Sequence, residues 1–120
     1  MLQLTPQSII FVATIHVDFR KGIDGLISVC KQKFSLDPIS GALFLFYNKG
    51  NTTIKILSFD GQGFWLCTKR LSTGKFKSKA KPLTSLTYQQ ICYRSLYILI
   101  NNGDPTSAKL AKNWRPLSSH

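Results

Sequence analysis

Residues 42–71 read ALFLFYNKGNTTIKILSFDGQGFWLCTKRL, and the order of apolar segments and turns in them is the strongest indication of the architecture. This stretch holds apolar segments at 42–47, 54–59 and 64–71, separated by the short turn sequences NKGN and DGQG. Turns of this length join antiparallel strands, because a parallel pair needs a long crossover connection. A further turn at 71–74 leads into residues 75–81, which we predict to be one more strand. The stretch therefore predicts an antiparallel β-meander.

The segment before the meander predicts one strand followed by one helix. Residues 9–17 are apolar and rich in β-branched side chains, which is typical of a buried strand. Asp18 then stands where a helix N-cap is expected. Beyond it, apolar side chains recur at helical spacing, at Ile23, Leu26, Ile27, Cys30 and Phe34. This stripe predicts an amphipathic helix over 19–34.

The end of the chain predicts a second helix and a tail. Thr87 and Gln90 have the spacing of a capping box, and the sequence NNGDP at 101–105 ends the helix. The predicted fold class is α+β. It consists of an antiparallel β-meander sheet of four to five strands, with an amphipathic helix after the first strand and a C-terminal helix packed on it. We expect residues 1–100 to form a single domain and residues 101–120 a basic C-terminal tail.

The charge of the chain is strongly positive and unevenly distributed. Among 120 residues, 16 Lys and Arg face five Asp and no Glu, so the net charge is +11. Six basic and four acidic residues leave +2 in residues 1–60, and ten basic and one acidic residue leave +9 in residues 61–120. Such a domain attracts polyanions, of which nucleic acid is the commonest. The alternative is a cationic coat that only keeps the protein in solution.

Basic residues in two parts of the chain form the candidate nucleic-acid-binding set. Every second residue of 75–81 is lysine, so an extended segment would present these ammonium groups on one face, roughly 6.7 Å apart, along a phosphate backbone. The alternative is that these lysines protect an edge strand from pairing. At the start of the first helix, Gly22 and Gly25 allow either the approach of an anion or tight packing of the helix on the sheet. The full set is Arg20, Lys21, Lys69, Arg70, Lys75, Lys77, Lys79 and Lys81.

The acidic residues and the histidine do not favour catalysis. A two-metal nuclease needs about three carboxylates that converge on Mg²⁺. The set Asp18, Asp24 and Asp60 is a less favoured candidate, because each aspartate of the chain stands at a turn or helix start that explains it locally. His16 lies in a predicted strand, where we expect a core or sheet-face position. We therefore predict no catalytic residue, no metal and no cofactor.

The cysteines and the apolar runs predict a cytoplasmic protein. Cys30, Cys67 and Cys92 are scattered, without the spacing of a metal site, so we expect buried, inert thiols in a reducing compartment. The apolar runs fall well short of the roughly 20 residues that a membrane span needs. We expect no signal peptide and no membrane partner.

Three motifs of the chain, in order, resemble those of a known family. They are DFRKGIDGL at 18–26, DPISGALFLFYN at 37–48 and KILSFDGQGFWL at 55–66, the last followed by KRL at 69–71. Over residues 4–96 the chain resembles the TnpB-type accessory protein of the insertion-sequence sixty-six family. It departs from that family at Phe59, where tryptophan is common, and at 77–79, where a Trp-Pro pair is common.

The resemblance implies a bacterial protein that assists transposition beside a separate transposase, which carries the acidic catalytic residues. Together with the charge, it predicts a non-catalytic accessory factor for DNA transposition. The predicted partners are double-stranded DNA, at the ends of the element, and the transposase or its complex with DNA. One alternative is a protein-interaction module that binds the transposase without touching DNA. The less favoured one is the Mg²⁺-dependent nuclease described above.

Overall fold

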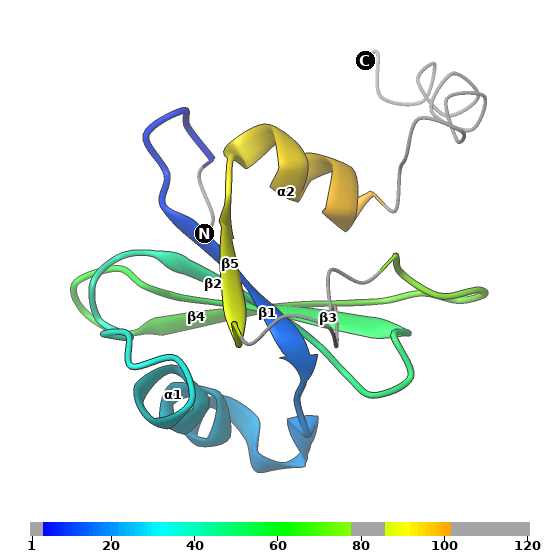
Figure 1. Cartoon of the computed structure of the whole chain (residues 1–120), viewed down its shortest axis with the longest axis horizontal. Helices are drawn as coiled ribbons and strands as arrows, with labels where there is room; N and C mark the ends of the chain where they lie inside the picture. The colour runs from blue at the N-terminus through cyan, green and yellow to red at the C-terminus, as the bar shows by residue number, and fades with distance from the viewer. Residues whose placement is uncertain (1–3, 78–85, 102–120) are drawn as a thin grey trace.

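The computed structural model describes residues 4–77 and 86–101, and these residues form a sheet with one α-helix on each face (Figure 1). In chain order the elements are β1 (Ile10–His16), a 3₁₀ helix (Phe19–Lys21), α1 (Gly22–Gln32), β2 (Leu43–Tyr47), β3 (Thr53–Phe59), β4 (Phe64–Arg70), β5 (Tyr88–Ile91) and α2 (Tyr93–Ile100). The described strands form one five-stranded sheet in the order β4-β3-β2-β1-β5. The predicted α+β class, with a helix after the first strand and a C-terminal helix, is confirmed.

The predicted meander is confirmed over β2, β3 and β4. Leu45 lies opposite Ile56 in the antiparallel β2–β3 pair, and Ile56 lies opposite Cys67 in the antiparallel β3–β4 pair. The first strand joins the sheet differently, because β1 runs parallel to β2 and antiparallel to β5. The parallel pair is possible because α1 and the loop after it supply the long crossover connection that such a pair needs. The sheet is therefore mostly antiparallel, with β4 and β5 at its edges.

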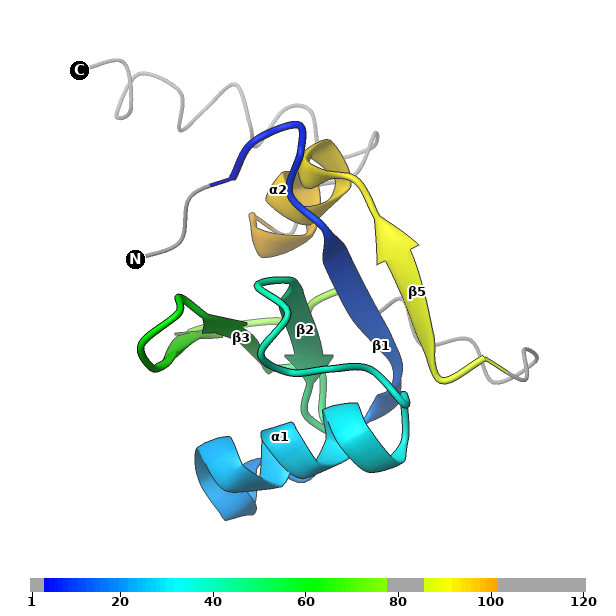
Figure 2. The same ribbon diagram turned by 90° about the vertical axis from the view of Figure 1, so that its left-hand side faces the viewer.

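The two helices pack on opposite faces of the sheet (Figure 2). The core under α1 includes Ala13, Leu26, Cys30, Phe34, Phe44, Phe46 and Leu57. The core under α2 includes Ile10, Val12, Leu43, Leu45, Tyr47, Ile54, Ile56, Leu96 and Leu99. Because β2 contributes side chains to both cores, its sequence is apolar throughout and lacks the period-two alternation of a half-exposed strand. Neither helix of the described residues has the length and hydropathy that a membrane crossing requires.

The helix predicted over 19–34 forms in two parts. Asp18 caps the 3₁₀ helix, since its carboxylate accepts a hydrogen bond of 2.9 Å from the backbone N–H of Arg20. Gly22 then has φ 65° and ψ −155°, a conformation that in practice only glycine adopts, and α1 proper begins there. A Cβ on Gly25 would lie 2.4 Å from the Cβ of Lys21. The absence of a side chain at Gly25 therefore leaves room for Lys21 in the preceding turn. The expectation of tight helix–sheet packing at this position is wrong.

The capping box predicted at 87–90 is wrong, because residues 88–90 belong to a strand and Thr87 directly precedes it. Tyr88–Ile91 forms β5 on the open edge of β1, with Ile91 opposite Ile10. The Thr87 carbonyl accepts a hydrogen bond of 2.9 Å from the Thr14 N–H, and the Thr87 hydroxyl donates one of 3.0 Å to the Lys33 carbonyl. The local helix signal is thus overridden by backbone pairing with β1, and α2 begins only at Tyr93.

The strand predicted at 75–81 is not observed where the structure describes it. Residues 75–77 lie outside the sheet, and the rest of the segment, with Lys79 and Lys81, lies outside the described residues. Phe76 holds the segment in place, because its buried ring packs on Tyr47 with the ring centroids 6.5 Å apart. Its backbone N–H donates a hydrogen bond of 2.6 Å to the Asn51 carbonyl. The alternation predicted from the sequence therefore survives locally, with Phe76 buried between exposed Lys75 and Lys77.

Candidate nucleic-acid interface

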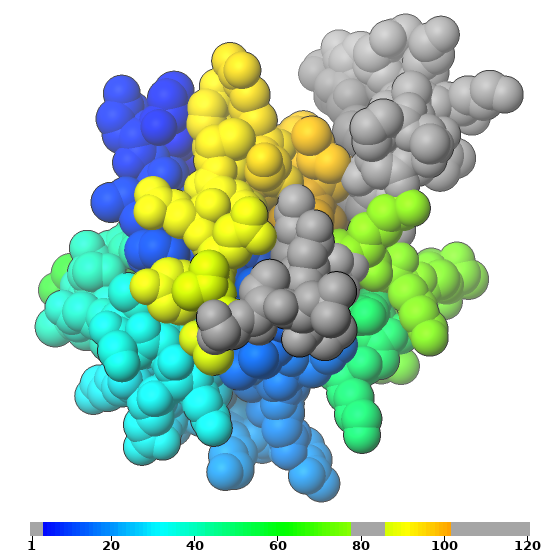
Figure 3. All heavy atoms as spheres, in the orientation of Figure 1, coloured from blue at the N-terminus to red at the C-terminus, as the bar shows by residue number. Residues whose placement is uncertain are grey.

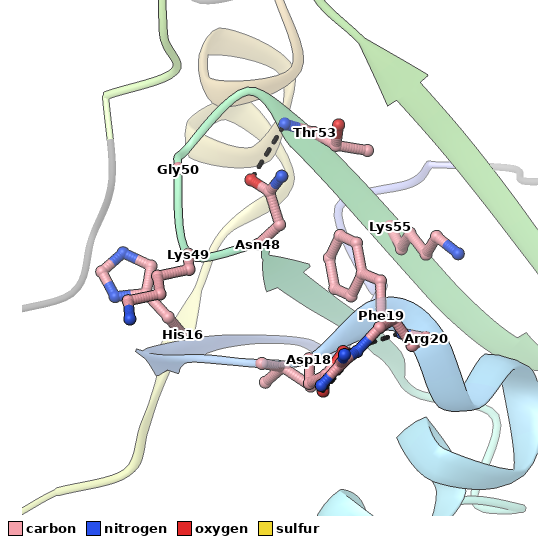
Figure 4. A pocket seen from close by; sticks show the side chains of 10 residues that line it. His16, Asp18, Phe19, Arg20, Asn48, Lys49, Gly50, Thr53 and Lys55 are labelled. Carbon is pink, nitrogen blue, oxygen red and sulfur yellow. Dashed lines mark hydrogen bonds and ion pairs between the residues drawn. The ribbon is translucent and has the colours of Figure 1, made fainter.

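A basic cleft opens where β1 and β2 both end. The carboxyl ends of parallel strands meet at the same edge of a sheet, and ligands of such sheets commonly bind beyond that edge. The cleft has a volume of about 990 Å³. It is lined by His16, Val17, Asp18, Phe19, Arg20, Asn48, Lys49, Gly50, Thr53 and Lys55 (Figure 4). We call this feature the β1–β2 cleft.

Cations outnumber anions in the β1–β2 cleft. Arg20, Lys49 and Lys55 line it, against the single carboxylate of Asp18. Asp18 accepts a short hydrogen bond of 2.7 Å from the Arg20 guanidinium, and this contact lowers the pKa of the carboxyl to about 2. The Arg20 side chain is nevertheless 90% exposed. Because a guanidinium has five N–H donors, Arg20 keeps donors for a second anion while Asp18 orients it.

An aromatic ring positions Lys55, one of the two lysines that line the cleft. The ammonium of Lys55 lies over the Phe19 ring, 5.0 Å from its centroid, which is within cation–π range. Figure 4 shows this pair on one side of the cleft and His16 with Lys49 on the other. Lys55 and Phe19 are both half-buried. The contact therefore positions the Lys55 ammonium at the cleft without removing it from water.

The turn between β2 and β3 presents Lys49 and Gly50 on a hydrogen-bonded loop. The Asn48 side-chain carbonyl accepts hydrogen bonds of 2.9 Å from the Thr52 N–H and 3.2 Å from the Thr53 N–H. Asn51 adopts φ 57°, and its side-chain oxygen lies 3.0 Å from Nε2 of His16. This contact ties the turn to the end of β1. His16, expected in the core or on a sheet face, is exposed and lines the cleft.

Further basic residues lie near the β2–β3 turn, which forms one side of the cleft. Arg70 lies opposite Thr53 in the β3–β4 register, so its side chain leaves the sheet on the same face as Thr53, a cleft residue. The hydrogen bond from Phe76 to Asn51 brings the exposed Lys75 and Lys77 beside the turn. Figure 3 shows the green atoms of the turn and the yellow-green atoms of residues 71–77 on one side of the molecule.

The structure thus brings some of the predicted binding residues together and separates others. Arg20 lines the cleft, Arg70 shares a sheet face with the cleft residue Thr53, and Lys75 and Lys77 lie beside the β2–β3 turn. Lys21 is exposed in the 3₁₀ helix and does not line the cleft. Lys69 lies opposite Ile54, on the face that α2 covers, and its ammonium donates a hydrogen bond of 2.7 Å to the Ile100 carbonyl. Its charge therefore stabilises the C-terminal end of α2.

Sequence reasoning missed three residues of the cleft: His16, Lys49 and Lys55. Each is an isolated basic residue in a strand or a turn, so no local run of charge marks it. The alternation in β3 carried a usable signal, because Lys55 stands on the face opposite Ile54 and Ile56, which enter the α2 core. The cleft itself depends on the parallel pairing of β1 with β2, which the turns of the meander do not reveal.

The aspartates and cysteines of the described residues form no metal centre of three or more ligands. Asp37 and Asp60 accept backbone N–H groups of their own turns. Cys30 is buried, and this burial raises the pKa of its thiol to about 12. Cys92, by contrast, is exposed, and the hydrogen bond from Ser95 lowers the pKa of its thiol. The expectation of buried thiols is therefore wrong for Cys92.

Comparison with known proteins shows the family of the chain. The family described as IS66 Orf2 like protein matches residues 8–104. The chain belongs to the IS66 Orf2-like family. The resemblance seen in the three sequence motifs is thereby confirmed, and the match includes the β1–β2 cleft together with Arg70, Lys75 and Lys77.

Two relatives of this IS66 Orf2-like protein come from Sinorhizobium fredii (strain NBRC 101917 / NGR234). "Uncharacterized protein y4hO" is 37% identical over 67 residues, which are 56% of this chain and 58% of the relative. "Uncharacterized protein y4jC" is 40% identical over 67 residues, which are 56% of this chain and 57% of the relative. The chain thus spans less than two-thirds of the length of either relative. No solved structure matches it.

Proposed function

We propose that this IS66 Orf2-like protein is a non-catalytic accessory factor for DNA transposition, and that it binds double-stranded DNA through the β1–β2 cleft. Family membership supports an accessory role in transposition, and we place that role beside a transposase at the ends of the insertion sequence. The observation that carries DNA binding is the convergence of Arg20, Lys49 and Lys55 on one cleft that holds a single carboxylate. Bond breaking is left to the transposase.

The charges around the cleft suit a phosphate backbone. Arg20 offers guanidinium donors that Asp18 has already oriented, and Lys49 and Lys55 offer ammonium groups on opposite walls. Arg70, Lys75 and Lys77 extend the positive surface beyond the turn. If four to six of these cations neutralise phosphates, the logarithm of affinity falls with the logarithm of salt concentration at a slope of about −4 to −5. Such contacts position DNA without reading its sequence.

A pair of matched double variants tests the cleft. K49Q/K55Q removes two charges from the cleft, whereas K31Q/K33Q removes two exposed charges at the far end of α1, about 15 Å along that helix. Fluorescence anisotropy with labelled duplexes, one of terminal-repeat and one of random sequence, measures affinity across ionic strength. We expect K49Q/K55Q to reduce the salt slope by about 2 for both duplexes and K31Q/K33Q to leave it nearly unchanged.

Three results of this experiment would contradict the proposal. They are a flat salt dependence, an equal loss of affinity in both double variants, or a loss confined to one sequence. The first result, together with co-purification of the transposase at a salt concentration that displaces DNA, would favour the protein-interaction module instead. Adding Mg²⁺ to the same duplexes tests the nuclease alternative, which predicts cleavage that Asp24→Asn abolishes without unfolding the protein.

A further inference from the structure

The turn between β3 and β4 carries an exposed tryptophan and a charged carboxylate, far from the β1–β2 cleft. Strand β3 begins at Thr53 beside the cleft and ends at Phe59, so the turn at 60–63 lies about 20 Å away along the strand. In Figure 1 the turn lies at the left-hand end of β3 and β4, and the yellow-green segment after β4 lies at the right. The two regions can therefore be occupied at the same time.

Hydrogen bonds fix the geometry of this turn. One carboxylate oxygen of Asp60 accepts bonds of 2.9 Å from the Gln62 N–H and 3.0 Å from the Gly63 N–H. The other accepts a bond of 2.7 Å from the indole N–H of Trp65. The contacts with Gly63, Gln62 and Trp65 lower the pKa of Asp60, so its carboxyl is ionised at neutral pH. The orientation of the indole is thus set before any partner arrives.

The fixed indole is open to solvent beside a shallow hollow. Trp65 is 46% exposed, a large fraction for a side chain of a strand in a β-sheet. The hollow has a volume of about 420 Å³ and is lined by Asp60, Gln62, Gly63, Phe64 and Trp65. Phe64, which also lines the hollow, packs its ring on Phe59 with centroids 5.0 Å apart. An exposed and preoriented tryptophan of this kind is typical of a residue that dominates an interface.

The charge of this hollow is opposite to that of the rest of the protein. Its lining holds the Asp60 carboxylate and no Lys or Arg. The ion pair found within the described residues joins Asp18 and Arg20, so Asp60 has no cationic side-chain partner among them. In a chain with a net charge of +11, the lining of this hollow carries one negative charge. It would repel the phosphates that accompany a nucleobase and attract a cation.

We propose that the Asp60–Trp65 hollow binds an arginine side chain of a protein partner. A guanidinium can stack on the face of an indole and gains cation–π energy there. Asp60 uses three of the roughly four lone-pair positions of its carboxylate, so one position next to the indole remains for a charge-assisted hydrogen bond. Arginine fits this combination better than lysine, because its planar group can stack and donate together. The site is independent of DNA binding at the cleft.

The experiment follows the indole N–H signal of Trp65 by NMR in the full chain. The variant Trp114→Phe removes the other indole of the sequence, so the remaining indole signal belongs to Trp65. The probes are the peptide acetyl-Gly-Arg-Gly-amide and its citrulline counterpart, which has nearly the same shape without the charge. We expect the arginine peptide to shift the Trp65 signal saturably and to bind at least about tenfold more tightly than the citrulline peptide.

Two variants with opposite expected effects keep the test decisive. Asp60→Asn retains an oxygen for the turn N–H groups and loses the charge, so arginine-peptide affinity should fall at least about fivefold. Gln62→Glu adds a carboxylate at an exposed position of the same hollow, so affinity should rise. Equal shifts by the arginine and citrulline peptides would overturn the proposal. So would unchanged affinity in both variants, or tighter saturation of the Trp65 signal by a single-stranded oligonucleotide than by the arginine peptide.

Discussion

Phe76→Ala tests whether one side chain holds the basic segment 75–77 on the sheet. Phe76 is 4% exposed, lies 6.5 Å from the Tyr47 ring between centroids, and donates a backbone hydrogen bond of 2.6 Å to Asn51. Truncation of a core phenylalanine to alanine costs about 3–5 kcal/mol. The lower end applies here, because the segment lies outside the sheet and can relax after truncation. We expect a loss of about 3 kcal/mol, which is more than a hundredfold in the folding equilibrium.

Urea unfolding followed by circular dichroism measures this loss. Phe76→Leu fills most of the same volume and should cost less than about 1.5 kcal/mol. Lys31→Ala, at an exposed position of α1, is the control and should stay within about 0.5 kcal/mol of the parent. Equal losses of stability in Phe76→Ala and Phe76→Leu, or a loss below about 1 kcal/mol in Phe76→Ala, would show that the Phe76 ring does not hold this segment.

The start of α1 and the thiols can be tested by stability and by chemical labelling. Gly22→Ala should lower stability by about 1–3 kcal/mol in the same urea assay, because φ 65° with ψ −155° strains any residue with a Cβ; an unchanged midpoint would contradict this. Asp18 has a pKa lowered from 3.8 to about 2 by the hydrogen bond from Arg20, so its stabilising contribution is complete above pH 3.8 and is lost as pH falls through about 2. Asp18→Asn should lack this part of the acid dependence, measured by thermal unfolding between pH 5 and pH 2. A thiol reagent at pH 8 should modify Cys92 quickly and Cys30 only on unfolding, and rapid labelling of native Cys30 would disprove its burial.

The fold was predictable where local pattern and tertiary structure agree. The apolar stripe from Ile23 to Phe34 indicates a helix, because this apolar face is the one that packs on the sheet. The short turns indicate antiparallel neighbours, because a parallel pair needs a longer connection. Thr87 and Gln90 misled because a capping box is a signal of only four residues. The edge of β1 offered backbone partners to those residues, and local preference cannot outweigh such pairing.

The candidate site was predictable only in part, because basic residues that are neighbours in the sequence are not always neighbours in the folded protein. Lys69 belongs to the more basic half of the chain, yet the β3–β4 register directs its side chain to the end of α2. Lys49 and Lys55 come from the nearly neutral half, and the parallel pairing of β1 with β2 brings them to Arg20. A search for runs of like charge therefore finds Lys69, which does not line the cleft, and misses Lys49 and Lys55, which do.

The pairing of β5 with β1 has a consequence for how the protein is made. As the ribosome delivers the chain, β1 leaves the exit tunnel early, but its outer neighbour is completed only when residue 91 has been translated. Until then the nascent sheet has an open margin at β1 and lacks its α2 cover. A product shortened before residue 88 would keep that margin permanently and would tend to aggregate through it.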